Sequence, residues 1–189
     1  MVFESLKYIA NDLDEHLKRK YGTAESKVKL TNILDQDGSI PETNRNKVIL
    51  SLLSMEHEST VQNSQNAVNT GTHYFQVNPP LNFNVNIMFS CLFNQYEEGL
   101  KFLSDTIYFF QGRSLFNAQN SPGLDERIFQ LTLEVIKLNY HETYNLWASL
   151  GAKYIPSIPF KLRMLTFQAD ELIDQVASIS EQSLEVMPV

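Results

Sequence analysis

The chain has 189 residues, of which 43% are hydrophobic and 11% aromatic, a composition typical of folded globular proteins and not of disordered ones. Its 15 Lys and Arg against 22 Asp and Glu give a formal net charge of -7, and without a basic run the chain is a poor candidate for binding nucleic acid through its phosphates. The length suits one domain, so we expect a single α/β domain over residues 1–169 and a C-terminal tail over residues 170–189, a candidate partner-binding arm.

The cysteine content and the hydropathy indicate where the chain folds. Cys91 is the single cysteine and cannot form an internal disulfide, which fits folding in a reducing cytoplasm. Residues 1–21 carry acidic side chains and lack the apolar core of a signal peptide. No stretch approaches about 20 uninterrupted apolar residues, so we expect no membrane span.

The N-terminal third of the sequence predicts one helix and two strands. Apolar residues spaced three and four apart predict a helix over residues 2–21, with Gly22 as its C-terminal cap. A short strand is expected over residues 27–33. A second strand, over residues 47–55, is almost continuously apolar, which indicates burial on both of its faces.

The centre of the fold is predicted in the next part of the chain. Residues 59–77 are polar, can bury little apolar area and predict a long loop. Residues 81–89 then alternate between apolar and mostly amide side chains, which is the period of a strand. A helix over residues 96–111 follows, with Leu100, Leu103, Ile107 and Phe110 at helical spacing, and Gly112 is expected to cap it.

The C-terminal part predicts two more strands, over residues 127–139 and 160–167, and a short helix over residues 141–150. The tail carries a short helical stripe of Leu172, Ile173 and Val176. The order of elements predicts an α/β or α+β fold, with a mixed central sheet of about five strands packed against about three helices.

Motifs for catalysis or metal binding are incomplete. His57 and His141 each begin a His-Glu-x-x sequence, but Val61 and Asn145 stand where a second zinc-binding histidine is needed. Cys91 lies in an apolar strand, where desolvation disfavours the thiolate and favours inert packing. We therefore assign no catalytic, cofactor-binding or metal-binding residue, and the alternative of a small hydrolase has no motif in its favour.

Four segments carry a resemblance to a known family: FESLKYIANDLDEHLKRKYG, NKVILSLLSMEHE, NPPLNFNVNIMFSCLFNQYEEGLKFLSDTIYFFQG and LTLEVIKLNYHETYNLWASLGAKYIPSIPFKLRMLTF. In this order they resemble the cap, or tail-terminator, proteins of phage-tail-like extracellular contractile injection systems of the antifeeding-prophage type. The similarity covers nearly the whole chain up to about Phe167. Some members of that family carry a further C-terminal domain that this chain lacks, so we do not expect the function of that extension here.

The resemblance implies a tail-terminator-like fold and a structural role. Such caps form a ring, commonly a hexamer, on the end of the inner tube and contractile sheath away from the baseplate. They stop polymerisation and hold the sheath extended. The implied partners are other copies of the chain, the tube and sheath proteins, and a second cap paralogue. The chain would be made in the bacterial cytoplasm and become part of a particle that is released from the cell or anchored to a membrane.

Two sets of residues are candidate partner contacts: Trp147, Lys153 and Tyr154 beside a glycine turn, and Leu172, Ile173 and Val176 in the tail. A core position for Trp147 is an equally valid interpretation. Asn82, Asn84 and Asn86 share one face of the central strand and are expected either to be solvated or to contact a second layer. An adaptor elsewhere in the tail or baseplate of the same particle is the alternative function.

Overall fold

The computed structural model describes residues 1–59, 67–69, 73–77, 80–167 and 172–177. Contacts divide the chain into two compact units. Unit 1 comprises Met1–His57 and Phe83–Leu165, and unit 2 comprises Glu58–Asn82 and Thr166–Val189. The predicted boundary at residue 169 between a single domain and a C-terminal arm stays a prediction.

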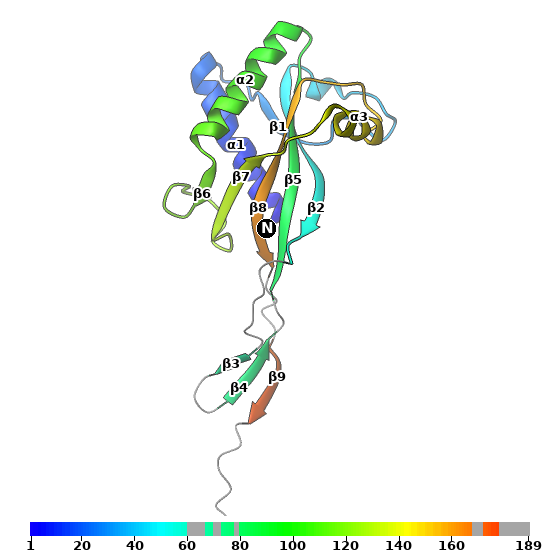
Figure 1. Cartoon of the computed structure of the whole chain (residues 1–189). Coiled ribbons are helices and arrows are strands. Elements are labelled where there is room, and N and C mark those ends of the chain that lie inside the picture. The colour runs from blue at the N-terminus through cyan, green and yellow to red at the C-terminus, as the bar shows by residue number, and fades with distance from the viewer. Residues whose placement is uncertain (60–66, 70–72, 78–79, 168–171, 178–189) are drawn as a thin grey trace, which may run out of the picture. The chain divides into compact units, whose positions relative to one another are not determined.

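Unit 1 is built on a mixed sheet of six strands in the order β1-β2-β5-β8-β7-β6 (Figure 1). The strands are β1 (Val28–Leu30), β2 (Lys47–His57), β5 (Leu81–Leu92), β6 (Leu115–Asn117), β7 (Gln130–Val135) and β8 (Ser157–Phe167). The β1/β2 pair is parallel, and the β2/β5, β6/β7 and β7/β8 pairs are antiparallel. The predicted mixed α+β fold is confirmed. The strand beyond the expected five is β6, which at 3 residues is too short to give a period of two.

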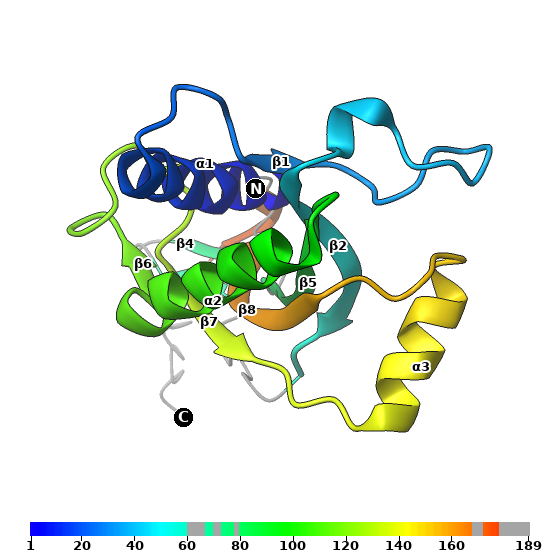
Figure 2. The same cartoon turned by 90° about the horizontal axis from the view of Figure 1, so that it is seen from above.

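The helices are α1 (Val2–Tyr21), α2 (Tyr96–Gly112) and α3 (Tyr140–Ser149), with a 3-10 turn, η1, at Glu42–Asn44. In both views α1 and α2 lie side by side (Figures 1 and 2). Gly22 caps α1 in the left-handed region at φ 62°, as predicted. Gly112 was wrongly predicted as a cap, because it is the last residue of α2 and Arg113 at φ -140° follows it.

The buried stripe of α2 differs from the predicted one. Gly99, Phe102, Thr106 and Phe110 are buried, whereas Leu100 and Ile107 are 40% and 38% exposed. The reason is aromatic packing: Phe102 stacks on Tyr21 of α1 with ring centroids 4.5 Å apart. The side of α2 that carries Phe102 therefore faces the core, instead of the side that carries Leu100 and Ile107.

Strand β5 has helices on both of its faces. Phe89 contacts Phe110 of α2 at 4.9 Å, whereas its neighbour Met88 belongs to a buried cluster with Trp147 of α3. Successive side chains of a strand point to opposite faces, so α2 and α3 cover opposite faces of β5. The predicted packing of the alternating apolar face under the aromatic helix is confirmed by the Phe89–Phe110 contact.

The amide face of β5 is buried, and the expectation of a solvated face was wrong. Asn84 and Asn86 are 4% and 8% exposed. The Asn86 side-chain nitrogen donates hydrogen bonds to the Ser54 hydroxyl at 2.9 Å and to the Glu56 carboxylate. The neighbouring strand β2 therefore supplies polar partners that let an amide lie within the sheet. Burial of β2 on both faces holds for Val48–Ser51 only, since Leu52 is 44% exposed.

Unit 2 contains an antiparallel sheet of three strands in the order β3-β4-β9, formed by β3 (Ala67–Asn69), β4 (His73–Val77) and β9 (Leu172–Ala177). The loop predicted over residues 59–77 is therefore wrong where β3 and β4 lie, and the helical stripe predicted in the tail is wrong where β9 lies. Pairing between distant segments, with Tyr74 opposite Val176, replaces the local pattern. Residues 60–66, 70–72 and 78–79 of the predicted loop and central segment, and residues 170–171 and 178–189 of the tail, lie outside the described residues.

Candidate assembly surfaces

The described residues contain no group of three or more His, Cys, Asp or Glu side chains that could hold a metal ion. Cys91 is 2% exposed, and burial raises the pKa of its thiol to about 12, so it is packed as a protonated thiol. The His57 ring stacks edge-on against Phe83 at 5.6 Å. Among the helices that the structure describes, none is long and apolar enough to cross a membrane.

Helix α3 begins at a capping box. The Asn139 side chain accepts a hydrogen bond from the Glu142 backbone N–H at 2.9 Å, and the Glu142 carboxylate accepts one from the Asn139 N–H at 2.8 Å. These reciprocal bonds satisfy two donors at the start of the helix. The N-terminus of α3 is therefore fixed by its own side chains.

Trp147 anchors α3 to the sheet. It is 4% exposed and packs with Ile33, Ile49, Met88 and Ile155. Its indole N–H is buried and has no hydrogen-bond partner among the residues that the structure describes. The structure thus gives Trp147 a core position, which leaves little of its surface for contact with a partner.

A groove of about 840 Å³ lies beside α3. We call it the aromatic groove, and its lining residues are Leu138, Tyr140, Thr143, Tyr144, Trp147, Ala148, Ala152 and Tyr154. Trp147 and Tyr154 meet edge to face with ring centroids 5.7 Å apart, and Tyr154 is itself 62% exposed. Tyrosine and tryptophan with apolar neighbours are enriched in protein interfaces.

The aromatic groove brings together the first set of predicted contact residues. Trp147 and Tyr154 line it, and Lys153 is an exposed residue next to Tyr154. Tyr140 and Tyr144, exposed by 91% and 66%, belong to it but were not predicted. Their spacing of four residues along the expected helix was the signal that could have identified them.

The second predicted set lies in unit 2. Leu172, Ile173 and Val176 belong to β9, which has β4 as its one neighbour among the described strands. An edge strand leaves a row of backbone N–H and C=O groups available for pairing with another strand. The geometry of this segment therefore suits strand addition better than the packing of a helix.

Phe129 is an exposed aromatic residue that the sequence analysis missed. It is 91% exposed. It is the last residue of a turn, residues 125–129, that is held by hydrogen bonds and by one buried side chain. We call these residues the Phe129 turn. The Asp125 carboxylate accepts hydrogen bonds from the backbone N–H, Nε and a terminal nitrogen of Arg127, at 2.9, 3.0 and 2.6 Å. The Ile128 N–H donates to the Asp125 carbonyl at 2.8 Å, and the Ile128 side chain is 4% exposed.

The Arg127 guanidinium also sets the charge of this turn, because its hydrogen bonds hold the pKa of the Asp125 carboxyl well below its usual range. The ion pair and the buried Ile128 fix both sides of the turn. Phe129 thus projects from a defined turn, and its exposure is not that of a frayed end.

Comparisons with known proteins identify the fold. A family model, that of the Pvc16 N-terminal domain, matches residues 6–180. No curated protein matches the sequence. A solved structure of the sheath/tube terminator in the extended state, from the extracellular contractile injection system PVC, is 12% identical, with a TM-score of 0.60 over 96% of this chain and 63% of that one.

A second solved structure, of the anti-feeding prophage cap, a tube terminating cap, is also 12% identical, with a TM-score of 0.56 over 93% of this chain and 60% of that one. The chain therefore spans 63% and 60% of the length of these two structures. At 12% identity, the two likenesses show a shared fold.

Proposed function

The chain belongs to the Pvc16 N-terminal domain family, and from this membership we propose that it is a structural cap on the tube and sheath of an extracellular contractile injection particle. The observation that carries the proposal is the fold that it shares, over 96% of its length, with a protein described as a sheath/tube terminator. As a cap it would stop polymerisation of the particle and stabilise the extended state.

Termination sets a physical requirement. The end of a growing tube presents the same surface after each added ring, so a terminator has to bind that surface on one side and withhold it on the other. Its two sides must therefore differ. For the binding side the chain offers the backbone edge of β9 in unit 2.

In our proposal the edge of β9 contacts the tube or sheath protein. Strand addition draws its affinity from main-chain hydrogen bonds, which depend little on the partner's side chains. Other contacts would come from additional copies of the chain in a ring, commonly sixfold, and from a second cap paralogue. The chain would act without catalysis, as an assembly component of a particle that is built in the cytoplasm.

The test is to image particles with and without the chain. In particles carrying the chain with a visible label, we expect density at the end away from the baseplate. Without the chain, we expect tubes of irregular length and sheaths that are not held extended. Label density at the baseplate would instead support the alternative function of an adaptor, and particles of normal length without the chain would contradict capping.

A further inference from the structure

We propose that the aromatic groove receives the Phe129 turn of an adjacent copy of this chain, so that subunits join head to tail. This inference rests on the proposed function, because a cap that surrounds a tube has to form a ring. It goes further by assigning the two surfaces that would close the ring.

The Phe129 turn has the properties of an anchor that inserts into a neighbour. Its phenyl ring is 91% exposed, although the residue before it, Ile128, is 4% exposed and fixes the backbone. Inserting a side chain that already projects from a fixed turn costs little conformational entropy. A large exposed aromatic ring on such a support is a typical centre of binding energy.

The aromatic groove offers the matching concave surface. Tyr144 and Tyr154 both line it, and the Tyr154 ring meets Trp147 edge to face at 5.7 Å. An inserted phenyl ring could pack edge to face against these rings, which is the arrangement that aromatic pairs prefer. The tyrosine hydroxyl groups could meanwhile stay hydrated at the rim.

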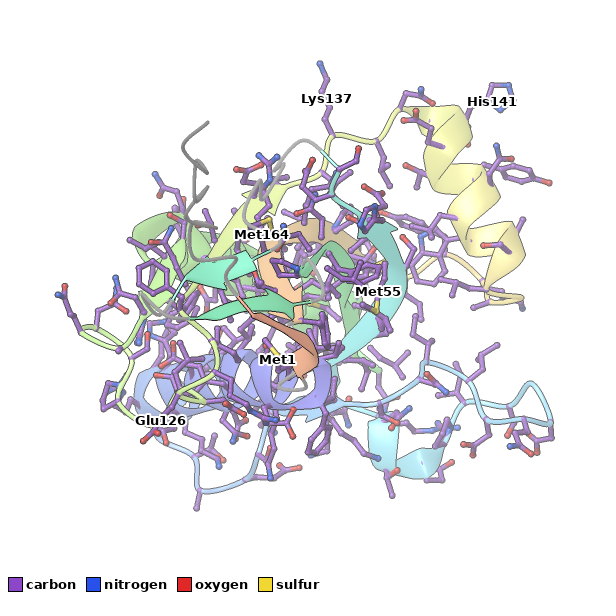
Figure 3. The ribbon with its side chains drawn as sticks, turned by 90° about the horizontal axis from the view of Figure 1, so that it is seen from below. Met1, Met55, Glu126, Lys137, His141 and Met164 are labelled. Atoms are coloured by element: carbon purple, nitrogen blue, oxygen red, sulfur yellow. The ribbon has the colours of Figure 1, made fainter. Side chains whose placement is uncertain are left out.

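The turn and the groove of one copy lie at opposite ends of β7. Phe129 comes immediately before Gln130, the first residue of this strand, and Leu138 follows its last residue, Val135, by three positions. Six residues of extended strand span roughly 20 Å. Figure 3 shows Glu126 at the lower left, Lys137 at the top centre and His141 at the upper right of the view. A Phe129 turn that fills the groove therefore has to come from another copy.

An interface between two different surfaces of the same chain is heterologous. Such interfaces form closed rings when the rotation between subunits closes, and open helices when it does not. The same contact repeated around an axis would give each copy one filled groove and one inserted turn. This is the connectivity that a ring-shaped cap requires.

Charges at the two surfaces are complementary. Glu126 is exposed beside the turn, where the charge of Asp125 is already matched by Arg127. Lys137 and Lys153 are exposed next to the groove residues Leu138 and Tyr154, and they outnumber the exposed Glu142 of α3, whose carboxylate accepts a hydrogen bond from the Asn139 N–H. Exposed charges of this kind orient the encounter more than they add to the affinity. They would favour the turn entering the groove over two grooves meeting each other.

The first experiment is site-specific cross-linking through Phe129. Phe129 is replaced by the photoreactive p-benzoylphenylalanine in the full chain, which is irradiated both after purification and in assembled particles. We expect cross-linked oligomers whose joined peptides pair Phe129 with residues 138–154 of a second copy. The matched control carries the same group at Tyr108, which is 72% exposed on α2, and should not react with the groove. Cross-links from Phe129 to other residues, or none in either sample, would overturn the inference.

The second experiment measures self-association. We expect Phe129→Ala to weaken it by at least about tenfold, without loss of folding because the side chain is 91% exposed. Phe3→Ala, which removes a ring exposed by 60%, is the control and should leave association unchanged. Equal association of all three proteins would count against the inference. Capping itself is measured separately by imaging the particle end, so a ring closed by other surfaces would leave the proposed function intact.

Discussion

The Tyr21 hydroxyl donates a hydrogen bond of 2.7 Å to the Asp105 carboxylate and thereby joins the last residue of α1 to the middle of α2. The other oxygen of Asp105 accepts a hydrogen bond from the Lys20 ammonium group. Asp105 itself is 7% exposed, and the Lys20 and Tyr21 side chains of α1 supply the hydrogen bonds that its buried carboxylate needs. Burial raises the pKa of the Tyr21 hydroxyl, and the hydrogen bond to Asp105 and the charge of that carboxylate raise it further.

The first prediction is that Asp105 stabilises the pairing of α1 with α2. Asp105→Ala should lower the free energy of unfolding by about 1–3 kcal/mol, because it leaves the Tyr21 hydroxyl and the Lys20 ammonium without their acceptor. Tyr21→Phe should cost about 1 kcal/mol, since the Lys20 contact remains. Urea unfolding measures both. Lys101→Ala, at an exposed position of the same helix, is the control and should change the value by less than about 0.5 kcal/mol.

The second prediction concerns Asp14 and pH. Burial alone would raise the pKa of its carboxyl, but hydrogen bonds from the Lys18 side chain and from the Val28 and Lys27 backbone N–H groups outweigh burial and hold the pKa below its usual value. Because the pKa is lower in the folded than in the unfolded protein, the stabilisation is present at neutral pH and is lost as the pH falls below about 4.

Asp14→Asn should therefore lower the free energy of unfolding at neutral pH by about 1–3 kcal/mol. Its difference from the unchanged protein should shrink as the pH falls through about 4. Asp12→Asn is the control, and its effect on the free energy of unfolding should change with pH in the opposite direction. Burial raises the pKa of Asp12 and makes its charged form unfavourable in the folded state. Chemical denaturation over a series of pH values measures the effect. A difference for Asp14→Asn that stays constant over this range would contradict the prediction.

The third prediction compares two glycines at the ends of helices. Gly22 lies at φ 62°, where a side chain is disfavoured although no atom stands in its way. Gly22→Ala should cost about 1–2 kcal/mol. Gly112 is helical and also has open space around it, so Gly112→Ala should be neutral or should stabilise by up to about 1 kcal/mol. Thermal unfolding of both variants gives the comparison, and an equal loss in both would contradict the conformational argument.

Elements with a long periodic pattern could be predicted from the sequence. The 20 residues of α1 and the 12 residues of β5 repeat their apolar positions often enough to identify both the element and its core-facing side. The identity of β6, β3, β4 and β9 depends instead on pairing with strands that are distant in sequence. A local pattern carries little of that information.

The candidate surfaces divide in the same way. Trp147 and Tyr154 could be predicted because an aromatic pair beside a glycine turn is a local feature. The exposure of Phe129 could not, because an aromatic residue next to a β-strand is normally expected inside. It is exposed because Ile128 takes the buried position and the Arg127–Asp125 pair fixes the turn. Burial of Asn86 depends likewise on the hydrogen bond that it donates to Ser54 of the neighbouring strand β2.

The fourth prediction separates a core residue from a surface residue of the aromatic groove. Trp147→Ala should lower the free energy of unfolding by about 3–5 kcal/mol, because it empties a buried position between α3 and the sheet. Tyr154→Ala should cost less than about 1 kcal/mol in folding, since its ring is 62% exposed. Urea unfolding and sedimentation together make the distinction. If Trp147→Ala folded with unchanged stability, the core position of Trp147 would be wrong. If Tyr154→Ala left self-association unchanged, the role of Tyr154 in the contact between copies would be wrong.

The fifth prediction is that β9 is needed for capping and not for the folding of unit 1. Deleting residues 168–189 removes β9, whereas α1, α2, α3 and the paired strands β1, β2, β6 and β7 stay complete. We expect a protein with a cooperative unfolding transition that fails to restore normal length to particles lacking the chain. Deleting residues 178–189 alone keeps β9 and is the matched control, which should restore length. Electron microscopy of the particles measures it. Particles of normal length and yield with the larger deletion would show that the partner binds elsewhere, and the edge of β9 would then have no part in termination.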